Sequence, residues 1–167
     1  AISGSSETIV AIPMEVKEPA STARVLSNIL DLEYDYVYDR ITRRASAVYV
    51  KRKVSEEVAE AVRKQNLSGI EFTEESKRYY PKGNLASHIL GFAGIDSQGL
   101  EGLELSYDRY LRGKPGKIGI ERDGAGRYIP DGIQQYVTPQ DGYNIYLTID
   151  EVIQYIVERE LDKAINE

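Results

Sequence analysis

The chain lacks cysteine and tryptophan and contains a single histidine, His88. Without cysteine it cannot form disulfides or a cysteine-based zinc site, and one histidine alone does not make a soft-metal site. No segment approaches the roughly 20 apolar residues that a membrane-spanning helix needs. The net charge of −6 does not fit broad nucleic-acid binding, which requires a clear basic face. We therefore expect no cofactor.

Tyrosine is the abundant aromatic residue, with thirteen tyrosines against two phenylalanines. A tyrosine suits half-buried positions because its ring is apolar and its hydroxyl can stay in contact with water. At 167 residues and 41% hydrophobic content, the chain can bury one moderate core, or two small cores joined by a stalk. We therefore expect thin lobes with much surface, and the alternative interpretation is that the tyrosines mark a contact surface.

The first 80 residues alternate strand and helix patterns, which predicts a compact α/β lobe. Apolar residues from Val25 to Leu30 recur at helical spacing after Pro19, a residue favoured at a helix start. Ser55 is a suitable N-cap for a helix that would bury Val58, Ala61 and Val62. The expected elements are a strand over 7–14, a helix over 19–30, a short helix over 34–42, a strand over 45–54, a helix over 55–65 and an extended connector over 70–80.

The second half is richer in glycine and predicts shorter elements. Asp123-Gly124 is the strongest turn dipeptide in a glycine-rich stretch. Thr148 and Glu151 form a capping box before an apolar helical stripe. The expected elements are short helices over 85–90 and 102–111, a long hairpin over 116–130, a strand over 143–149 and a final amphipathic helix.

A run of motif residues between positions 78 and 116 stands out. It reads R-x-x-P-x-G, then G-x-x-G-x-E, then L-x-G and a further glycine. Glycine and proline at fixed positions specify backbone shape, because glycine permits positive φ or a close approach and proline makes a turn rigid. The motif residues are Arg78, Pro81, Gly83, Gly99, Gly102, Glu104, Leu111, Gly113 and Gly116.

These motifs resemble the non-catalytic N-terminal module of class B penicillin-binding proteins. A third segment, Asp141-Gly-Tyr-Asn-Ile-Tyr-Leu-Thr-Ile-Asp150 with Gln154, is similar to the entry into that family's transpeptidase domain. Three ordered signatures at family spacing are more specific than one short motif. The stretches around Phe72 and Phe92 are most similar to the division and sporulation branch of Gram-positive spore-forming bacteria.

The resemblance implies an α+β fold in which a pedestal carries a catalytic domain. We expect an elongated pedestal over residues 1–148, with a small α/β lobe at about 19–80 and a β-rich hairpin stalk over 1–18 and 81–148. Residues 149–167 would begin a truncated transpeptidase domain. The catalytic motifs Ser-x-x-Lys, Ser-x-Asn and Lys-Thr-Gly do not occur in the chain. We therefore expect no enzymatic activity here, in a piece of a longer serine D,D-transpeptidase.

The resemblance also implies location and partners. The module would lie outside the cytoplasmic membrane, tethered by an N-terminal anchor that precedes this sequence. Its partners would be its own transpeptidase domain, a membrane-embedded glycan polymerase and division or sporulation proteins, or a second copy in a homodimer, with no nucleic acid. The alternatives are a free-standing extracytoplasmic adaptor or oligomerisation domain, and a hydrolase that uses Glu101 or Glu104.

Two groups of charged residues yield structural hypotheses. We expect Arg78 and Glu104 to form an ion pair, because a guanidinium can hold a carboxylate through two parallel hydrogen bonds. A basic cluster stands out in an acidic chain and is interpreted either as a solvated strand face or as a docking surface for an acidic partner or anionic lipid. Its members are Arg40, Arg43, Arg44, Lys51, Arg52 and Lys53.

Overall fold

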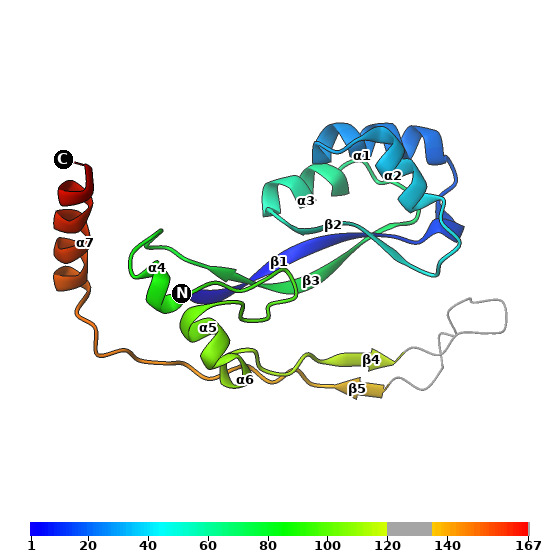
Figure 1. The fold of residues 1–167 in the computed structure, drawn as a ribbon. Coiled ribbons are helices and arrows are strands. Elements are labelled where there is room, and N and C mark those ends of the chain that lie inside the picture. The colour runs from blue at the N-terminus through cyan, green and yellow to red at the C-terminus, as the bar shows by residue number, and fades with distance from the viewer. Residues whose placement is uncertain (120–134, 167) are drawn as a thin grey trace. The chain divides into compact units, whose positions relative to one another are not determined.

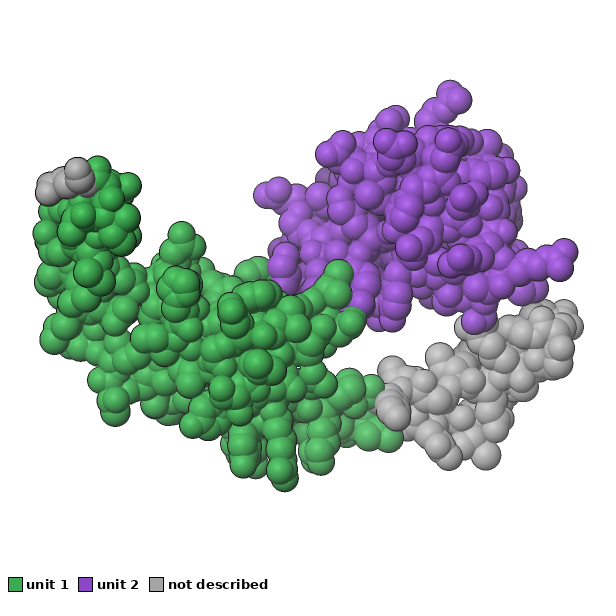
Figure 2. Space-filling model, in the orientation of Figure 1, with its two compact units in different colours: residues 1–2, 78–167 green, residues 3–77 purple. Residues whose placement is uncertain are grey.

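A computed structural model describes residues 1–119 and 135–166, and its chain divides into two compact units (Figure 1). Residues 3–77 form one unit, and residues 1–2 with 78–167 form the other (Figure 2). The mixture of helices and strands confirms the predicted α+β class. β1 (Ile2–Ala11) contributes to the sheet of the 3–77 unit, whereas the expected lobe of about 19–80 began after it.

A three-stranded sheet in the order β2-β1-β3 forms the base of the 3–77 unit. β2 (Val48–Val54) pairs antiparallel with β1, and β3 (Ile70–Tyr79) lies on the other side of β1. The expectation of a mere extended connector over 70–80 is therefore wrong. The segment is a strand because β1 supplies the pairing edge that its own sequence could not reveal.

An irregular register interrupts the β1–β2 pairing, where Lys53 has a φ of 53°. Two buried hydroxyl side chains of β1 satisfy the backbone there. Thr8 Oγ1 accepts a hydrogen bond from the Lys53 N–H at 3.0 Å, and Ser6 Oγ donates to the Val54 carbonyl at 2.9 Å. Because buried backbone groups need partners, these two polar residues belong in the sheet.

Three helices pack with the sheet around the hydrophobic core, and each begins where local chemistry favours it. α1 (Pro19–Leu30) starts at a proline, and α3 (Glu56–Arg63) follows Ser55, whose side chain accepts from the Val58 N–H at 3.4 Å. α2 is Tyr34–Ile41. These three helices are as predicted, except that α3 buries Ala59 in place of Ala61 and leaves Val58 partly exposed. The buried core residues are Ile9, Ala11, Val16, Ala23, Leu26, Leu30, Val37, Ile41, Val50, Val54, Ala59 and Val62.

The unit of residues 1–2 and 78–167 contains short elements joined by tight turns. The predicted helix over 85–90 is α4 (Ser87–Leu90), and the single helix predicted over 102–111 is divided at Tyr107 into α5 (Gly102–Ser106) and α6 (Asp108–Leu111). β4 (Lys117–Gly119) pairs antiparallel with β5 (Gln135–Val137), which lies beyond the predicted hairpin of 116–130, and the predicted turn at Asp123-Gly124 lies outside the described residues. The final helix is α7 (Glu151–Asn166).

Two predictions near the C-terminal end are wrong. Residues 143–149 form no strand, because no partner strand lies beside them in the part of the chain that the structure describes. Asp150, and not Thr148, caps α7, since its Oδ1 accepts from the N–H groups of Val152 at 2.9 Å and Ile153 at 3.0 Å. An aspartate one residue before the helix has the geometry that an N-cap requires.

Candidate functional site: the Arg78–Glu104 hub and the Tyr–Arg ladder

The structure brings the predicted pair Arg78 and Glu104 together. The Arg78 Nε donates to Glu104 Oε1 at 2.7 Å, from the end of β3 to the start of α5. Glu104 is only 6% exposed, and the side chain of Arg78 is 20% exposed. A carboxylate buried this far needs a partner, so the ion pair fixes β3 against α5.

Tyr80 contacts the ion pair of Arg78 and Glu104, and we term these three residues the hub. Its hydroxyl oxygen accepts a hydrogen bond from the Ala93 N–H at 3.0 Å and contacts the Glu104 carboxylate. Burial, followed by the negative charge of Glu104, raises the pKa of Tyr80 above its ordinary value. The sequence analysis missed this role, although a tyrosine immediately before the motif proline was the available signal.

Two motif glycines lie where no side chain fits. A Cβ on Gly99 would lie 1.9 Å from the Glu104 carbonyl oxygen. Gly102 has a φ of 58°, and a Cβ there would lie 2.6 Å from both the Gly91 nitrogen and the Ile89 carbonyl oxygen. The turn before α5 therefore packs backbone on backbone, and the Gly99 N–H donates to Asp108 Oδ1 at 2.7 Å. Asp108 is a second residue that the motif analysis did not include.

The remaining motif residues lie on either side of the hub. Pro81 and Gly83 are exposed in the turn after β3, and Leu111 ends α6. Gly113 and Gly116 flank a bridge in which Lys114 and Gln140 exchange backbone hydrogen bonds of 2.8 and 2.9 Å. The nine motif residues therefore serve backbone geometry and one ion pair.

The structure around Glu104 does not support the hydrolase alternative, for which a glycosidase acid/base pair would be the chemistry. Glu104 is buried and paired with Arg78, so it is inaccessible to a sugar, while Glu101 is exposed just before α5. An acid/base pair has to flank a substrate from two sides. Within residues 1–119 and 135–166, no group of three or more His, Cys, Asp or Glu side chains could hold a metal ion. Among those same residues, no helix has the length and apolar character needed to cross a membrane.

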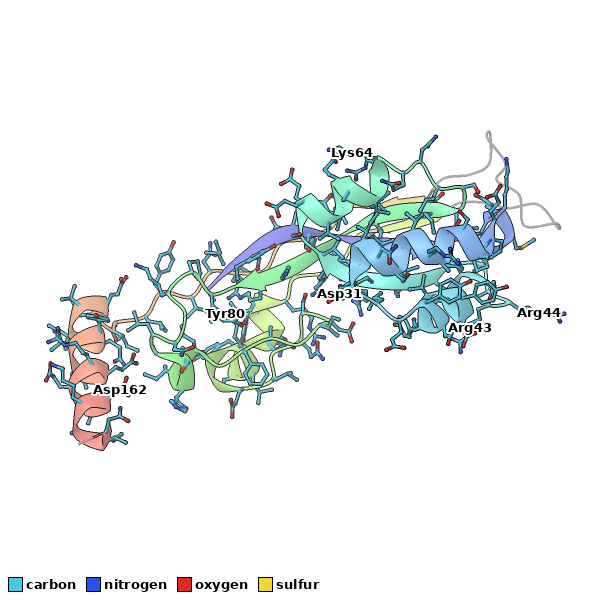
Figure 3. The ribbon with its side chains drawn as sticks, turned by 90° about the horizontal axis from the view of Figure 1, so that it is seen from above. Asp31, Arg43, Arg44, Lys64, Tyr80 and Asp162 are labelled. Carbon is cyan, nitrogen blue, oxygen red and sulfur yellow. The ribbon has the colours of Figure 1, made fainter. Side chains whose placement is uncertain are left out.

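The predicted basic cluster does not form one uniform patch. Arg52 forms an ion pair with Glu75 at 2.9 Å, and Lys51 Nζ donates to the Leu30 carbonyl. Lys53 occupies the irregular position in β2. Arg43 and Arg44 are exposed in the segment after α2 (Figure 3).

Arg40 and Arg52 alternate with two exposed tyrosines in what we term the Tyr–Arg ladder, comprising Tyr36, Arg40, Tyr49 and Arg52. The Arg40 guanidinium lies over the Tyr36 ring at 4.9 Å, and its Nη1 donates to the Tyr49 carbonyl at 3.0 Å. The Arg52 guanidinium lies over the Tyr49 ring at 5.2 Å. Each contact fits a cation–π geometry or a hydrogen bond, so the ladder links α2 to β2 through its side chains.

Comparisons with known proteins agree with the motif analysis. The family model "Penicillin-binding Protein dimerisation domain" matches residues 1–147. Stage V sporulation protein D of Bacillus subtilis (strain 168) is 40% identical over 163 residues, which are 96% of this chain and 25% of that protein. Peptidoglycan D,D-transpeptidase FtsI of Escherichia coli (strain K12) is 36% identical over 172 residues, covering 99% of this chain and 29% of that protein. The chain thus spans between a quarter and a third of the length of these two relatives.

Solved structures show the same fold. Penicillin-binding protein 2X from Streptococcus thermophilus has a TM-score of 0.61 at 24% identity, covering 96% of this chain and 28% of that one. A penicillin-binding protein (PBP2) from Helicobacter pylori, solved in complex with MreC, has a TM-score of 0.70 at 17% identity, covering 97% and 34%. Together with the family match over residues 1–147, these findings show that the chain belongs to the penicillin-binding protein dimerisation domain family.

Proposed function

We propose that this chain is the positioning and partner-docking module of a peptidoglycan D,D-transpeptidase that acts in septal or spore cell-wall synthesis. The observation that carries the proposal is the family match over residues 1–147, together with relatives named as a D,D-transpeptidase and a sporulation protein. Residues 1–148 would form the module, and 149–167 would begin the transpeptidase domain. The end of the family match at residue 147 supports that boundary.

The proposed module acts outside the cytoplasmic membrane, held by an N-terminal anchor that belongs to the longer protein. Its proposed partners are its own transpeptidase domain and a membrane-embedded glycan polymerase with division or sporulation proteins. The family description also supports a homodimer, and the Helicobacter pylori neighbour was solved with a second protein. In this proposal, the chain positions the catalytic domain, and the transpeptidase domain of the longer protein performs the acyl transfer.

Labelling with a fluorescent penicillin tests whether the catalytic activity lies in the transpeptidase domain and not in this chain. Because the chain has no Ser-x-x-Lys, Ser-x-Asn or Lys-Thr-Gly motif, it should give no labelled band on a denaturing gel. The longer protein should give a band that disappears when the sample is boiled first. A labelled band from the chain itself, absent from boiled protein, would contradict the proposal.

Arg43 and Arg44 test the docking part of the proposal, because both are exposed and neither pairs with a carboxylate among the described residues. In the longer protein, Arg43→Glu with Arg44→Glu should leave penicillin labelling and the melting temperature unchanged but weaken recovery of the partner. Arg52 is omitted because its reversal would place a glutamate beside Glu75 and destabilise the sheet. Normal partner recovery by the double variant would remove these two arginines from the docking surface.

A further inference from the structure

The Tyr–Arg ladder presents aromatic rings and guanidinium groups in fixed positions on the surface of the 3–77 unit. Tyr36 is 42% exposed and Tyr49 is 48% exposed, although both are large aromatic residues. Neither ring belongs to the cluster of buried residues that forms the hydrophobic core. Large exposed rings beside arginines are the composition that most often dominates the energetics of protein interfaces.

The arginines of the ladder are held in place before any partner arrives. Arg52 is fixed by Glu75, with Nε–Oε2 at 3.1 Å and Nη2–Oε2 at 2.9 Å, and its guanidinium lies over Tyr49. Arg40 is fixed by the Tyr36 ring and the Tyr49 carbonyl. Side chains that are already ordered lose less conformational entropy on binding, so a ladder of this kind favours tight and directional contacts.

The charges around the ladder are mixed, and this decides between two kinds of anionic partner. Asp35 and Asp39 are exposed on α2 itself, four residues apart and therefore on one face of the helix. Asp35 and Asp39 directly precede Tyr36 and Arg40 on α2, so a flat anionic bilayer laid on the ladder would also approach these two carboxylates. A protein segment can instead place its own carboxylates opposite the arginines and avoid the aspartates.

We infer that the Tyr–Arg ladder, extended by Arg43 and Arg44, is a docking surface for an extended or helical protein segment that carries both apolar side chains and carboxylates. The apolar side chains would contact Tyr36 and Tyr49, and the carboxylates would pair with the remaining guanidinium donors of Arg40 and with the two exposed arginines. This inference rests on the proposal that the lobe docks a partner, and it adds the surface and the chemistry of that partner.

The test uses the isotopically labelled chain and three probes. The first probe is a synthetic 14-residue peptide of alternating leucine and glutamate, the second has glutamine at every glutamate position, and the third is phosphatidylglycerol vesicles. The first peptide should shift the amide resonances around Tyr36, Arg40 and Tyr49, and the second should bind about tenfold more weakly because it lacks the charge. The vesicles should cause no comparable shifts.

Two variants assign the binding to the ladder. Arg40→Gln should weaken binding of the glutamate peptide about tenfold. Arg109→Gln is the matched control, because Arg109 lies 5.9 Å from an exposed tyrosine ring, that of Tyr110, outside the ladder. Since Arg40→Gln could also disturb α2, Arg43→Gln with Arg44→Gln provides a second test that leaves every ladder contact in place.

Each contrary outcome overturns the inference in a defined way. Equal binding of the two peptides removes charge from the recognition, and shifts that map away from the ladder assign the surface elsewhere. Binding to vesicles alone makes the surface a lipid contact. If the ladder and Arg43/Arg44 variants bind the peptide as the unmodified chain does, while the longer protein still labels with penicillin and recovers its partner, the inference fails and the proposed function stands.

Discussion

The two compact units of this chain are stabilised by different kinds of contact. In the 3–77 unit, every buried apolar side chain except Ile12 belongs to one cluster around β1, α1, α2 and α3. In residues 78–116 and 137–166, the buried groups are the glycines at 91 and 99 and the carboxylate of Glu104. The 3–77 unit depends on removing apolar surface from water, and the 78–116 region depends on close backbone contacts and on one largely buried ion pair, Arg78–Glu104.

This difference explains why the two regions look unlike each other in sequence. A hydrophobic core accepts many combinations of apolar residues of similar volume, so the 3–77 unit shows periodicity without a fixed motif. A turn in which a Cβ would overlap a carbonyl accepts glycine alone, and a buried carboxylate needs its particular partner. The 78–116 region therefore reads as a motif.

Truncating the core should have the largest effect. Leu26 on α1 is fully buried, so Leu26→Ala should lower the free energy of unfolding by about 3–5 kcal/mol through lost burial and a residual cavity. Urea denaturation gives the loss, and amide exchange should show it in α1 and β1. Asn28→Ala, an exposed position on the same helix, should change the stability little. A small effect of Leu26→Ala would mean that the core collapses around the cavity.

Removing the hub arginine should have the next largest effect. Arg78→Ala leaves the buried Glu104 carboxylate without its ion-pair partner, and we expect a loss of about 2–4 kcal/mol, with a smaller loss for Arg78→Lys. Lys82→Ala is the control, since its ion pair with Glu151 is exposed and should contribute about 0–1 kcal/mol. Urea midpoints for both Arg78 variants within error of the unmodified chain would remove the hub from the comparison.

The motif glycines separate close approach from backbone conformation. Gly99→Ala would force a Cβ against the Glu104 carbonyl, and overpacking of this kind costs about 1–3 kcal/mol. Gly83 has a φ of 57° with open space around its Cα, so Gly83→Ala should cost only the strain of a left-handed residue, about 1 kcal/mol. Melting curves of the two variants compare the two costs. A larger loss for Gly83→Ala would make positive φ the dominant requirement.

Alkaline titration of Tyr80 should have the smallest effect. Its pKa in the folded chain is raised, chiefly by burial, so the neutral phenol is the stabilising form. The stability that this group contributes is fully present below its ordinary pKa of about 10 and is lost as the pH rises through the raised value. Tyr80→Phe should therefore show a shallower loss of stability above pH 10 than the unmodified chain, as followed by urea denaturation. Parallel pH curves would contradict this role.

Local sequence determined the features whose chemistry lies within a few residues. The bounds of α1 follow from a 3.6-residue period after a proline, and the start of α3 follows from Ser55, which accepts from a free N–H group. The motif spacing also predicted the ion pair of Arg78 and Glu104, because it contains two side chains of opposite charge whose geometries are complementary.

Tertiary structure decided the features that depend on distant partners. β3 is a strand because β1 lies beside it, whereas residues 143–149 alternate equally well but have no strand partner among the described residues. Arg52 forms an ion pair with Glu75, 23 positions away. Its charge is therefore compensated, and it does not extend the basic cluster that the neighbouring residues predicted. The two-residue alternation of a strand specifies which face each side chain occupies. Strand pairing and ion pairing also require a second segment, and only the fold brings that segment into contact.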